Sequence, residues 1–218
     1  SSSGVVATDT TGVGTARELI AATGYGGDKA IYAFGYDGSS YVSLSNLVSN
    51  SGVVATDTTG VGTVRFQLGA AIYGGDKALF AFGEGASGYL SLSNLVSNSG
   101  VVATDTTGIG TGRGALGACG YGGDKGIFAY GYTGSTNVTI SNLVSNTGVV
   151  ATDTSGVGTA HNAGASASYG GDKGIFGFGS GYTAVTNLVS NLGVVGSNVT
   201  GVGTAREGSA AAGYSNSA

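Results

Sequence analysis

The composition of this chain is dominated by small and apolar residues. Of its 218 residues, 45 are glycine, none is proline, methionine or tryptophan, and the formal net charge is −4. Charged residues make up 9% of the chain, against about 25% in an average soluble domain. Nucleic-acid binding requires clustered lysine and arginine, and a membrane-spanning helix requires about 18 consecutive apolar residues. The sequence contains neither, so it predicts no nucleic-acid partner and no membrane span.

Near-verbatim repeats run along the chain, and their period determines how the fold is interpreted. Successive copies lie 48 residues apart, except that the last spacing of GVVATDT and of NLVSN shortens to 45. The recurring motifs are GVVATDT, which begins at Gly4, Gly52, Gly100 and Gly148 and returns as GVVGSNV at Gly193; YGGDK, which begins at Tyr25, Tyr73, Tyr121 and Tyr169; and NLVSN, which begins at Asn46, Asn94, Asn142 and Asn187.

One repeat is predicted to form four β-strands. The first spans 18–25 and is rich in alanine, and the second spans 29–35, an aromatic and β-branched run. The glycines of the segment 26–28 supply positive φ for the turn between them. The third strand is predicted over 41–48, where apolar residues alternate with serines, and the fourth over 53–58. Glycine interrupts any helical period, so no helix is expected.

Four strands in about 48 residues, repeated in tandem, are typical of a β-propeller. The sequence therefore predicts an all-β single domain of four-stranded blades, with four complete repeats and a split partial fifth. Small first-strand residues fit the crowded centre of such a ring, and those expected near the axis are Ala21, Ala70, Ala118 and Ala167. The predicted bounds are 1–15 for a leftover outer strand, 16–63, 64–111, 112–159 and 160–204 for the repeats, and 205–218 for the partial repeat.

The two ends of the chain carry unmatched parts of a repeat. Residues 4–15 have the sequence of a fourth strand, and residues 205–214 have that of a first strand. Three arrangements are open: a five-fold ring with a split, incomplete blade, a four-fold ring with a redundant strand, or subunits that exchange strands. An unpaired strand edge promotes pairing with another chain, so the third arrangement would give a homo-oligomer.

The charged residues follow the repeat as well. Arginine recurs at Arg17, Arg65, Arg113 and Arg206, with His161 once in the same position, and aspartate recurs within TDT at Asp9, Asp57, Asp105 and Asp153. In a ring, equivalent positions lie far apart, so these side chains do not gather into one site. We expect each arginine to pair with an aspartate near a blade boundary, as a partly buried bridge with a structural role.

No pattern in the sequence indicates catalysis, a cofactor or a metal. A zinc site needs several histidine or cysteine ligands, whereas the chain has one of each, His161 and Cys119. The GGDK turn lacks the spacing of a phosphate-binding loop, and the TDT segments lack the alternating oxygen ligands of an EF-hand. The chain is therefore predicted not to be an enzyme, with no catalytic, cofactor-binding or metal-binding residue. Cys119 is expected to be buried in an alanine-rich strand.

Tyrosines gather in the loops between the second and third strands, which vary most between repeats. The loops read YDGSSY, EGASGY, YTGSTN and SGY, and their tyrosines are Tyr36, Tyr41, Tyr89, Tyr132 and Tyr182. Variable loops on a constant scaffold are how repeat proteins present binding surfaces, and exposed tyrosine is an effective contact residue. Two interpretations stay open: these tyrosines form binding loops, or they cover the strand ends.

The repeat resembles that of Kelch-type β-propellers. That family places an arginine before the first strand, and an apolar second strand that ends in paired glycines is followed by two outer strands. Here the recurring arginines and strands such as KAIYAFG and KGIFAYG occupy these positions. The chain departs from the family by a single glycine in place of the pair, as at Gly35 and Gly131, and by the absence of tryptophan. The repeats are also similar to those of virion and tail-associated proteins of marine bacteriophages.

These resemblances imply a non-enzymatic structural or interaction protein. Its location would be a virion, a phage tail or another extracellular assembly, and its partners would be other protein subunits of that assembly. The alternative is a carbohydrate-binding propeller with one weak site per blade, whose partners would be surface glycans. A lectin of this kind predicts equivalent pockets at equivalent positions of the blades.

Overall fold

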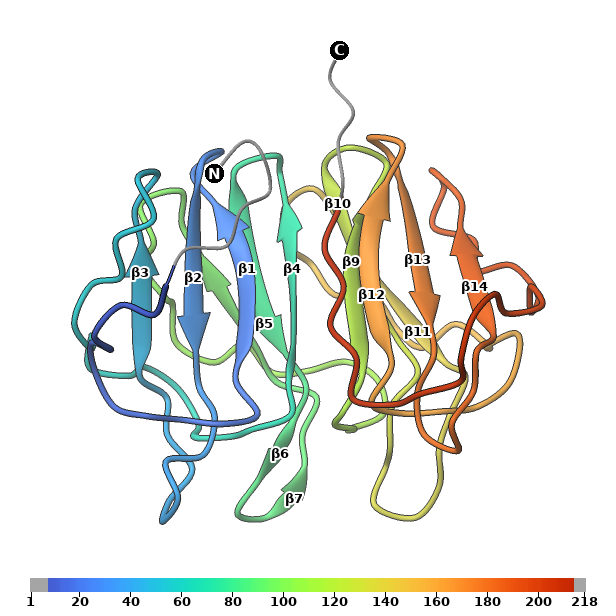
Figure 1. Cartoon of the computed structure of the whole chain (residues 1–218), viewed down its shortest axis with the longest axis horizontal. Helices are drawn as coiled ribbons and strands as arrows, with labels where there is room; N and C mark the ends of the chain where they lie inside the picture. Colours follow the sequence, from blue (N-terminus) through green and yellow to red (C-terminus); the bar gives the residue numbers. More distant parts are fainter. Residues whose placement is uncertain (1–7, 214–218) are drawn as a thin grey trace.

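The computed structural model describes residues 8–213, and this part of the chain is all-β, with no helix (Figure 1). It contains four antiparallel sheets of three strands each, one sheet per repeat, and a separate two-stranded hairpin. The predicted class is thereby confirmed. The predicted four-stranded unit is wrong as stated, because the fourth segment of each repeat does not form a continuous strand.

The four sheets share one topology, in which the middle strand is the second in sequence. Sheet 1 contains β1 (Ala21–Tyr25), β2 (Lys29–Ala33) and β3 (Ser45–Val48); sheet 2 contains β4 (Gly69–Tyr73), β5 (Lys77–Ala81) and β8 (Ser93–Val96); sheet 3 contains β9 (Gly117–Tyr121), β10 (Lys125–Ala129) and β11 (Ser141–Val144); sheet 4 contains β12 (Ala165–Tyr169), β13 (Lys173–Gly177) and β14 (Thr186–Val189). The hairpin β6 (Glu84–Gly85) and β7 (Gly88–Tyr89) lies in the loop that follows β5.

The third strand is shorter than predicted. It begins at Ser45 rather than Tyr41, because Tyr41 instead forms a bridge with Tyr36 that closes the preceding loop. The fourth segment of the first repeat touches β3 at two isolated bridges, Val48 with Val54 and Ser45 with Thr58. It needs one residue more than β3 to span the same distance, as at a β-bulge, so the ladder is interrupted.

The second strand ends earlier than predicted because the next residue adopts a left-handed backbone. Phe34, which follows Ala33, has φ of 62°, a conformation uncommon for residues other than glycine. The same conformation recurs once per repeat, at Phe82, Tyr130 and Phe178. It turns the chain away from the sheet and leaves an aromatic side chain at the sheet boundary.

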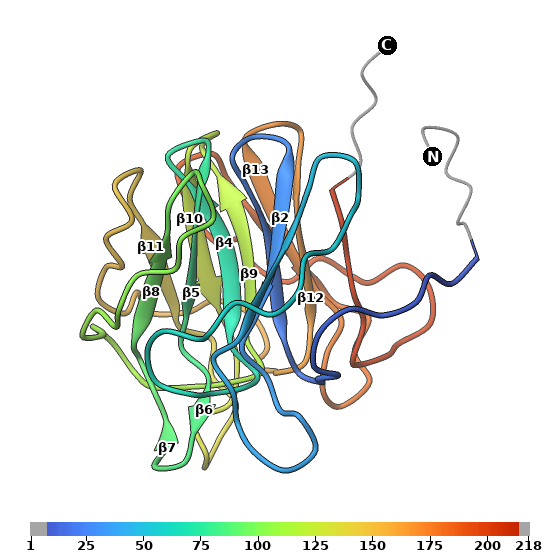
Figure 2. The same ribbon diagram turned by 90° about the vertical axis from the view of Figure 1, so that its left-hand side faces the viewer.

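Consecutive sheets pack face to face, in sequence order, from sheet 1 to sheet 4 (Figures 1 and 2). Their first strands, β1, β4, β9 and β12, are in contact with one another in succession. Phe80 of β5 is fully buried against sheet 1, and Phe128 of β10 is fully buried against sheet 2. Each of the three buried apolar clusters therefore joins two neighbouring sheets rather than filling one.

Backbone hydrogen bonds also link each repeat to the next, just before the first strand. The bonds run from Gln67 N to Leu19 O (3.1 Å), from Ala115 N to Gln67 O (2.8 Å), from Ala163 N to Ala115 O (2.9 Å) and from Gly208 N to Ala163 O (3.0 Å). The C-terminal segment thus occupies the position that would precede the first strand of a fifth sheet.

The first strands and the C-terminal segment surround a shared cavity. One part of it, of about 370 Å³, is lined by two consecutive residues from each repeat, 19–20, 67–68, 115–116 and 163–164, and by residues 208–209. Three of the alanines predicted near the axis, Ala21, Ala70 and Ala118, line the adjoining part of the cavity, whereas Ala167 does not. There sheet 4 contributes Ala165 and Ser166.

One glycine per repeat allows the fourth segment to cross closely over the chain that precedes the third strand. A Cβ atom on Gly108 would overlap the backbone carbonyl of Ser91. We therefore expect Gly108→Ala to lower the free energy of unfolding by about 2 kcal/mol or more, as overpacking against rigid backbone does. Gly12→Ala is the matched control, because open space surrounds Gly12. Equal urea midpoints for the two variants would contradict this close approach.

Candidate interaction site

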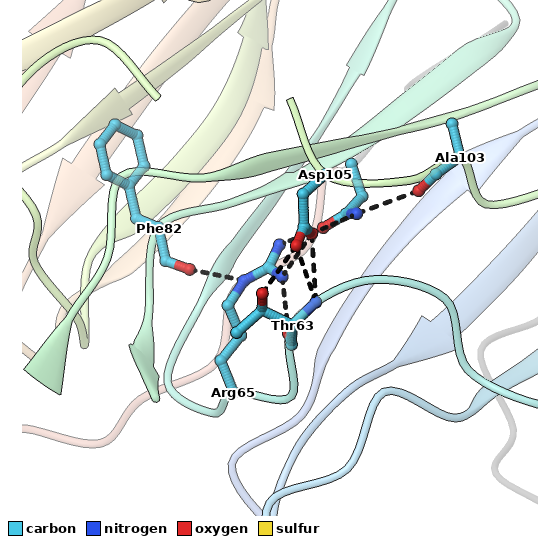
Figure 3. A network of polar contacts seen from close by, with 6 residues as sticks. Thr63, Arg65, Phe82, Ala103 and Asp105 are labelled. Atoms are coloured by element: carbon cyan, nitrogen blue, oxygen red, sulfur yellow. Dashed lines mark hydrogen bonds and ion pairs between the residues drawn. The ribbon is translucent and has the colours of Figure 1, made fainter. Parts of the chain in front are cut away.

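Two of the four repeated arginines, Arg65 and Arg113, are the most completely buried charged groups among the described residues. Arg65 is 0% exposed. Its guanidinium donates to Phe82 O (2.9 Å), to Thr63 O (3.0 Å) and to Asn94 Oδ1 (2.5 Å), as Figure 3 shows for the labelled partners. The arginine therefore ties the chain before the first strand to the end of the second strand and to the third strand of its own sheet.

The asparagine of the NLVSN motif links this arginine to the aspartate of TDT. Asn94 Nδ2 donates to Ala103 O (3.0 Å) and to Asp105 Oδ1 (2.9 Å). Asp105 also accepts two bonds from Thr63, from its backbone N–H (2.9 Å) and its hydroxyl (2.7 Å). Burial acts to raise the pKa of Asp105, but the bonds from Thr63 and Asn94 outweigh it and hold that pKa below its usual value.

In most repeats, the predicted direct pair of arginine and aspartate is replaced by an asparagine that hydrogen-bonds both side chains. Within the described residues, one such pair lies within 4.0 Å, Arg65 with Asp105 at 3.9 Å. Arg17 and Arg113 each bond an asparagine, Asn46 and Asn142. The bond from threonine to aspartate recurs between Thr15 and Asp57 and between Thr111 and Asp153, and Thr159 bonds Asn198 in the last repeat. Asp9 is exposed, and no polar contact joins it to another described residue.

The arginine also contacts the preceding sheet. The guanidinium carbon of Arg65 lies 4.2 Å from the ring centroid of Phe34, that of Arg113 lies 4.2 Å from Phe82, and that of Arg206 lies 4.3 Å from Phe178. His161 takes the arginine position at the remaining boundary, where its ring stacks on Tyr130 with centroids 4.2 Å apart. The left-handed aromatic residues thus receive a cation or a ring from the next repeat.

Burial changes the acidity of these groups without making them reactive. Desolvation lowers the pKa of Arg65 and of Arg113 to about 10, opposed by the negative charges of Asp105 and Asp153 respectively. Both guanidinium groups therefore stay charged at neutral pH. Burial also lowers the pKa of His161, against the bond between its Nδ1 and Thr159 O. The arrangement holds neighbouring sheets together, and its charges are directed inward rather than toward a ligand.

Sequence reasoning missed the asparagine and the aromatic residue of this network. The asparagine could have been found, since it recurs in every NLVSN motif and stands 11 residues before the aspartate or its Asn198 replacement. The aromatic residue gave no such signal, because positive φ at a phenylalanine cannot be recognised from residue type.

The loop tyrosines lie at one end of the molecule, where the loops between second and third strands project from the lower edge of Figure 1. Tyr36 packs edge-on against Tyr41, which stacks on Phe66 at 4.6 Å between centroids, and Tyr89 packs edge-on against Tyr132. These four side chains are half-buried, whereas Tyr182 is 67% exposed. The loops therefore brace one another, and Tyr182 is the tyrosine most accessible to a partner.

The opposite end carries the constant GGDK turns. Each lysine pairs with the aspartate beside it, at distances of 3.3 Å for Lys29–Asp28, 3.2 Å for Lys77–Asp76, 3.0 Å for Lys125–Asp124 and 2.8 Å for Lys173–Asp172. All four pairs are solvent-exposed, so their contribution to stability is small.

Cys119 lies in β9, and its thiol is buried between sheets 3 and 4. Burial raises the pKa of this thiol to about 12. Because the thiolate is the reactive species, we expect Cys119 in the folded protein to resist an aromatic disulfide reagent at pH 8. In concentrated urea, one thiol per chain should react with the reagent at the rate of a solvent-exposed cysteine. Rapid reaction without denaturant would contradict the packing of sheet 4 on sheet 3.

Among residues 8–213, no three histidine, cysteine, aspartate or glutamate side chains lie close enough together to hold a metal ion. The same residues include no helix that could cross a membrane. Comparison with known proteins gives no matching family model and no similar curated protein.

Proposed function

We propose that the protein is a non-enzymatic structural or interaction protein built on a Kelch-like β-propeller. In this proposal the four sheets are blades, the bridged fourth segments are their outer edges, and the C-terminal segment is the inner strand of a split fifth blade. Support comes from the shared cavity, which all four first strands and residues 208–211 line. The arginine or histidine contact at each successive boundary gives independent support.

The observation that carries the functional part is the contrast between the two ends of the molecule. The GGDK turns are the same in every repeat, whereas the loops at the other end differ in sequence and in length. The recurring arginine and aspartate side chains are occupied in holding the sheets. A constant scaffold with one variable end is suited to binding other macromolecules.

We propose that the partners are other protein subunits of a virion, a phage tail or another extracellular assembly. This location is suggested by the resemblance of the repeat motifs to those of marine bacteriophage particles, which rests on the sequence pattern alone. Protein subunits are favoured over glycans because the loop tyrosines pack on one another and leave no equivalent aromatic platform in each repeat.

Photocrosslinking in the native assembly tests this proposal. A photoreactive phenylalanine placed at Tyr182, in a variable loop, should crosslink to another protein of the assembly. The same group at Lys29, in a constant turn, should not. Crosslinking from position 29 alone, or from neither position, would contradict the proposal. Saturable binding of the chain to a glycan array at several equivalent sites would favour the lectin alternative.

A further inference from the structure

The two end sheets expose faces that correspond to the two halves of one interface. At each internal boundary, an aromatic residue of the second strand packs into the preceding sheet, and Phe80, Phe128 and Phe176 are at most 1% exposed. Tyr32 holds the same position in sheet 1 and is 39% exposed. The opposite face is uncovered on sheet 4. Its third-strand residue Leu188 is 42% exposed, whereas the equivalent leucines of the other three sheets are half-buried.

The arginine contact is also incomplete at both ends. Arg17 has no aromatic ring beneath it within the described residues, although Arg65 and Arg113 do. It lies instead beside a pocket of about 210 Å³ whose lining includes Val13, Ile20, Tyr32 and Val54. At the other end, Arg206 stacks on Phe178 but is itself exposed. Each end therefore carries part of the contact that a further sheet would complete.

The described backbone between these faces, residues 8–15 and 209–213, forms no strand ladder. Residues 209–213 follow the inner position of a fifth sheet, yet within the described chain they make no backbone hydrogen bond. Residues 8–15 have the sequence of an outer segment and show no bridge to a third strand. In every other repeat a second and a third strand lie between these two positions. The part of the predicted outer strand that precedes residue 8 lies outside the described residues.

We propose that the uncovered space between sheet 4 and sheet 1, called here the open slot, binds a β-hairpin that carries the second- and third-strand pattern of this repeat. The proposal rests on the propeller arrangement proposed above. An aromatic residue at the end of the donated second strand would lie beneath Arg17, and one two residues earlier would pack against Phe178. The asparagine of the donated third strand would accept from Arg206 and donate to Asp9, as Asn94 does between Arg65 and Asp105.

A hairpin fits this slot better than a second copy of the chain does. In each copy, the second strand of every sheet is already paired on both edges. A second copy could cover one exposed face, but it would leave the backbone of residues 209–213 unpaired. A hairpin would both pair with the backbone of residues 209–213 and cover the exposed faces, because strand addition satisfies backbone groups while the side chains of the added strands fill the faces.

The probe is a fluorescent synthetic peptide of residues 77–98, KALFAFGEGASGYLSLSNLVSN, added to the full chain. We expect saturable binding at one peptide per chain by fluorescence anisotropy, with a higher melting temperature for the complex. A peptide with Phe82→Ala should bind about tenfold more weakly, because it lacks the ring beneath Arg17. Full-length protein with Arg206→Ala should also bind the peptide more weakly, whereas full-length protein with Lys77→Ala should bind it as the parent protein does.

Three results would overturn the inference. They are no saturable binding, equal binding of the Phe82→Ala peptide, and a dimer of the chain alone that excess peptide does not disperse. The last would show that a second copy covers the slot. Arg206 is exposed, so its replacement should leave the fold intact, which circular dichroism checks. Failure here leaves the crosslinking result at Tyr182 untouched, so this inference and the proposed function can fail separately.

Discussion

Replacing Arg65 by alanine should lower the free energy of unfolding by about 3–5 kcal/mol, the usual cost of removing one side of a buried charged contact. The variant leaves the carbonyl of Phe82 and the Oδ1 of Asn94 without their donor. It also removes the cation from the ring of Phe34 and opens space between sheets 1 and 2. Urea unfolding followed by circular dichroism measures the change.

Lys77→Ala is the control for this prediction. Lys77 carries the same charge in sheet 2, but its side chain is 43% exposed and pairs with a neighbour in a surface turn. Its replacement should change the free energy of unfolding by no more than about 0.5 kcal/mol. Equal losses for the two variants would show that the arginine does not hold the sheets together.

Phe128→Ala should destabilise the protein by about 3–5 kcal/mol, as truncation of a buried phenylalanine does. Its ring is fully buried, lies 5.4 Å from that of Phe82 between centroids, and approaches Gly69, where a Cβ atom would come within 2.9 Å of it. The small residue in β4 is what allows β10 to approach this closely. Differential scanning calorimetry and urea titration together give the loss.

Tyr32→Ala is the matched comparison, because Tyr32 holds the equivalent position in sheet 1. No described sheet covers its side chain, which is 39% exposed. Its loss should cost about 1 kcal/mol, in proportion to the smaller area that it buries. Two equal losses would mean that sheet 1 is covered as sheet 3 is, and would contradict the open end face.

The sequence predicted those parts of the fold that depend on local pattern. The first and second strands follow from an alanine-rich run and an aromatic, β-branched run, although the first begins at Ala21 rather than at residue 18, and the turn between them follows from positive φ at Gly26 and Gly27. The third strand was predicted too early, because the tyrosines at 36 and 41 have high strand propensity but are used to close a loop. The fourth strand was overpredicted, since a run of β-branched residues does not reveal a bulge.

The site was harder to predict because its partners lie in different repeats. Thr63 and Asp105 are 42 residues apart, and no local pattern brings them together. Repetition did identify the arginine and the aspartate as structural positions. It could not show that asparagine stands between them, because that depends on how the third strand faces the arginine. It also could not assign the aromatic partner, which belongs to the preceding sheet.

The contacts that join neighbouring sheets inside the molecule are the same contacts that are incomplete at sheets 1 and 4. Because every repeat contributes the same two faces, the four sheets of residues 8–213 form three interfaces and leave one face of each kind uncovered within that part of the chain. The aromatic residue of the second strand is buried at an internal boundary, as Phe80 is, whereas Tyr32, at the equivalent position of the end sheet, is exposed. The open slot is therefore a direct consequence of the repeat.

A crystal structure of the full chain would show whether identical faces join the sheets in order around one cavity. We expect the guanidinium of Arg65 over Phe34 and that of Arg113 over Phe82, with the first strands of all four sheets lining the cavity. We also expect Tyr32 and Phe178 to face the gap between sheets 1 and 4. A linear stack of sheets, in which residues 19–20 and 208–209 line no shared cavity, would rule out this arrangement.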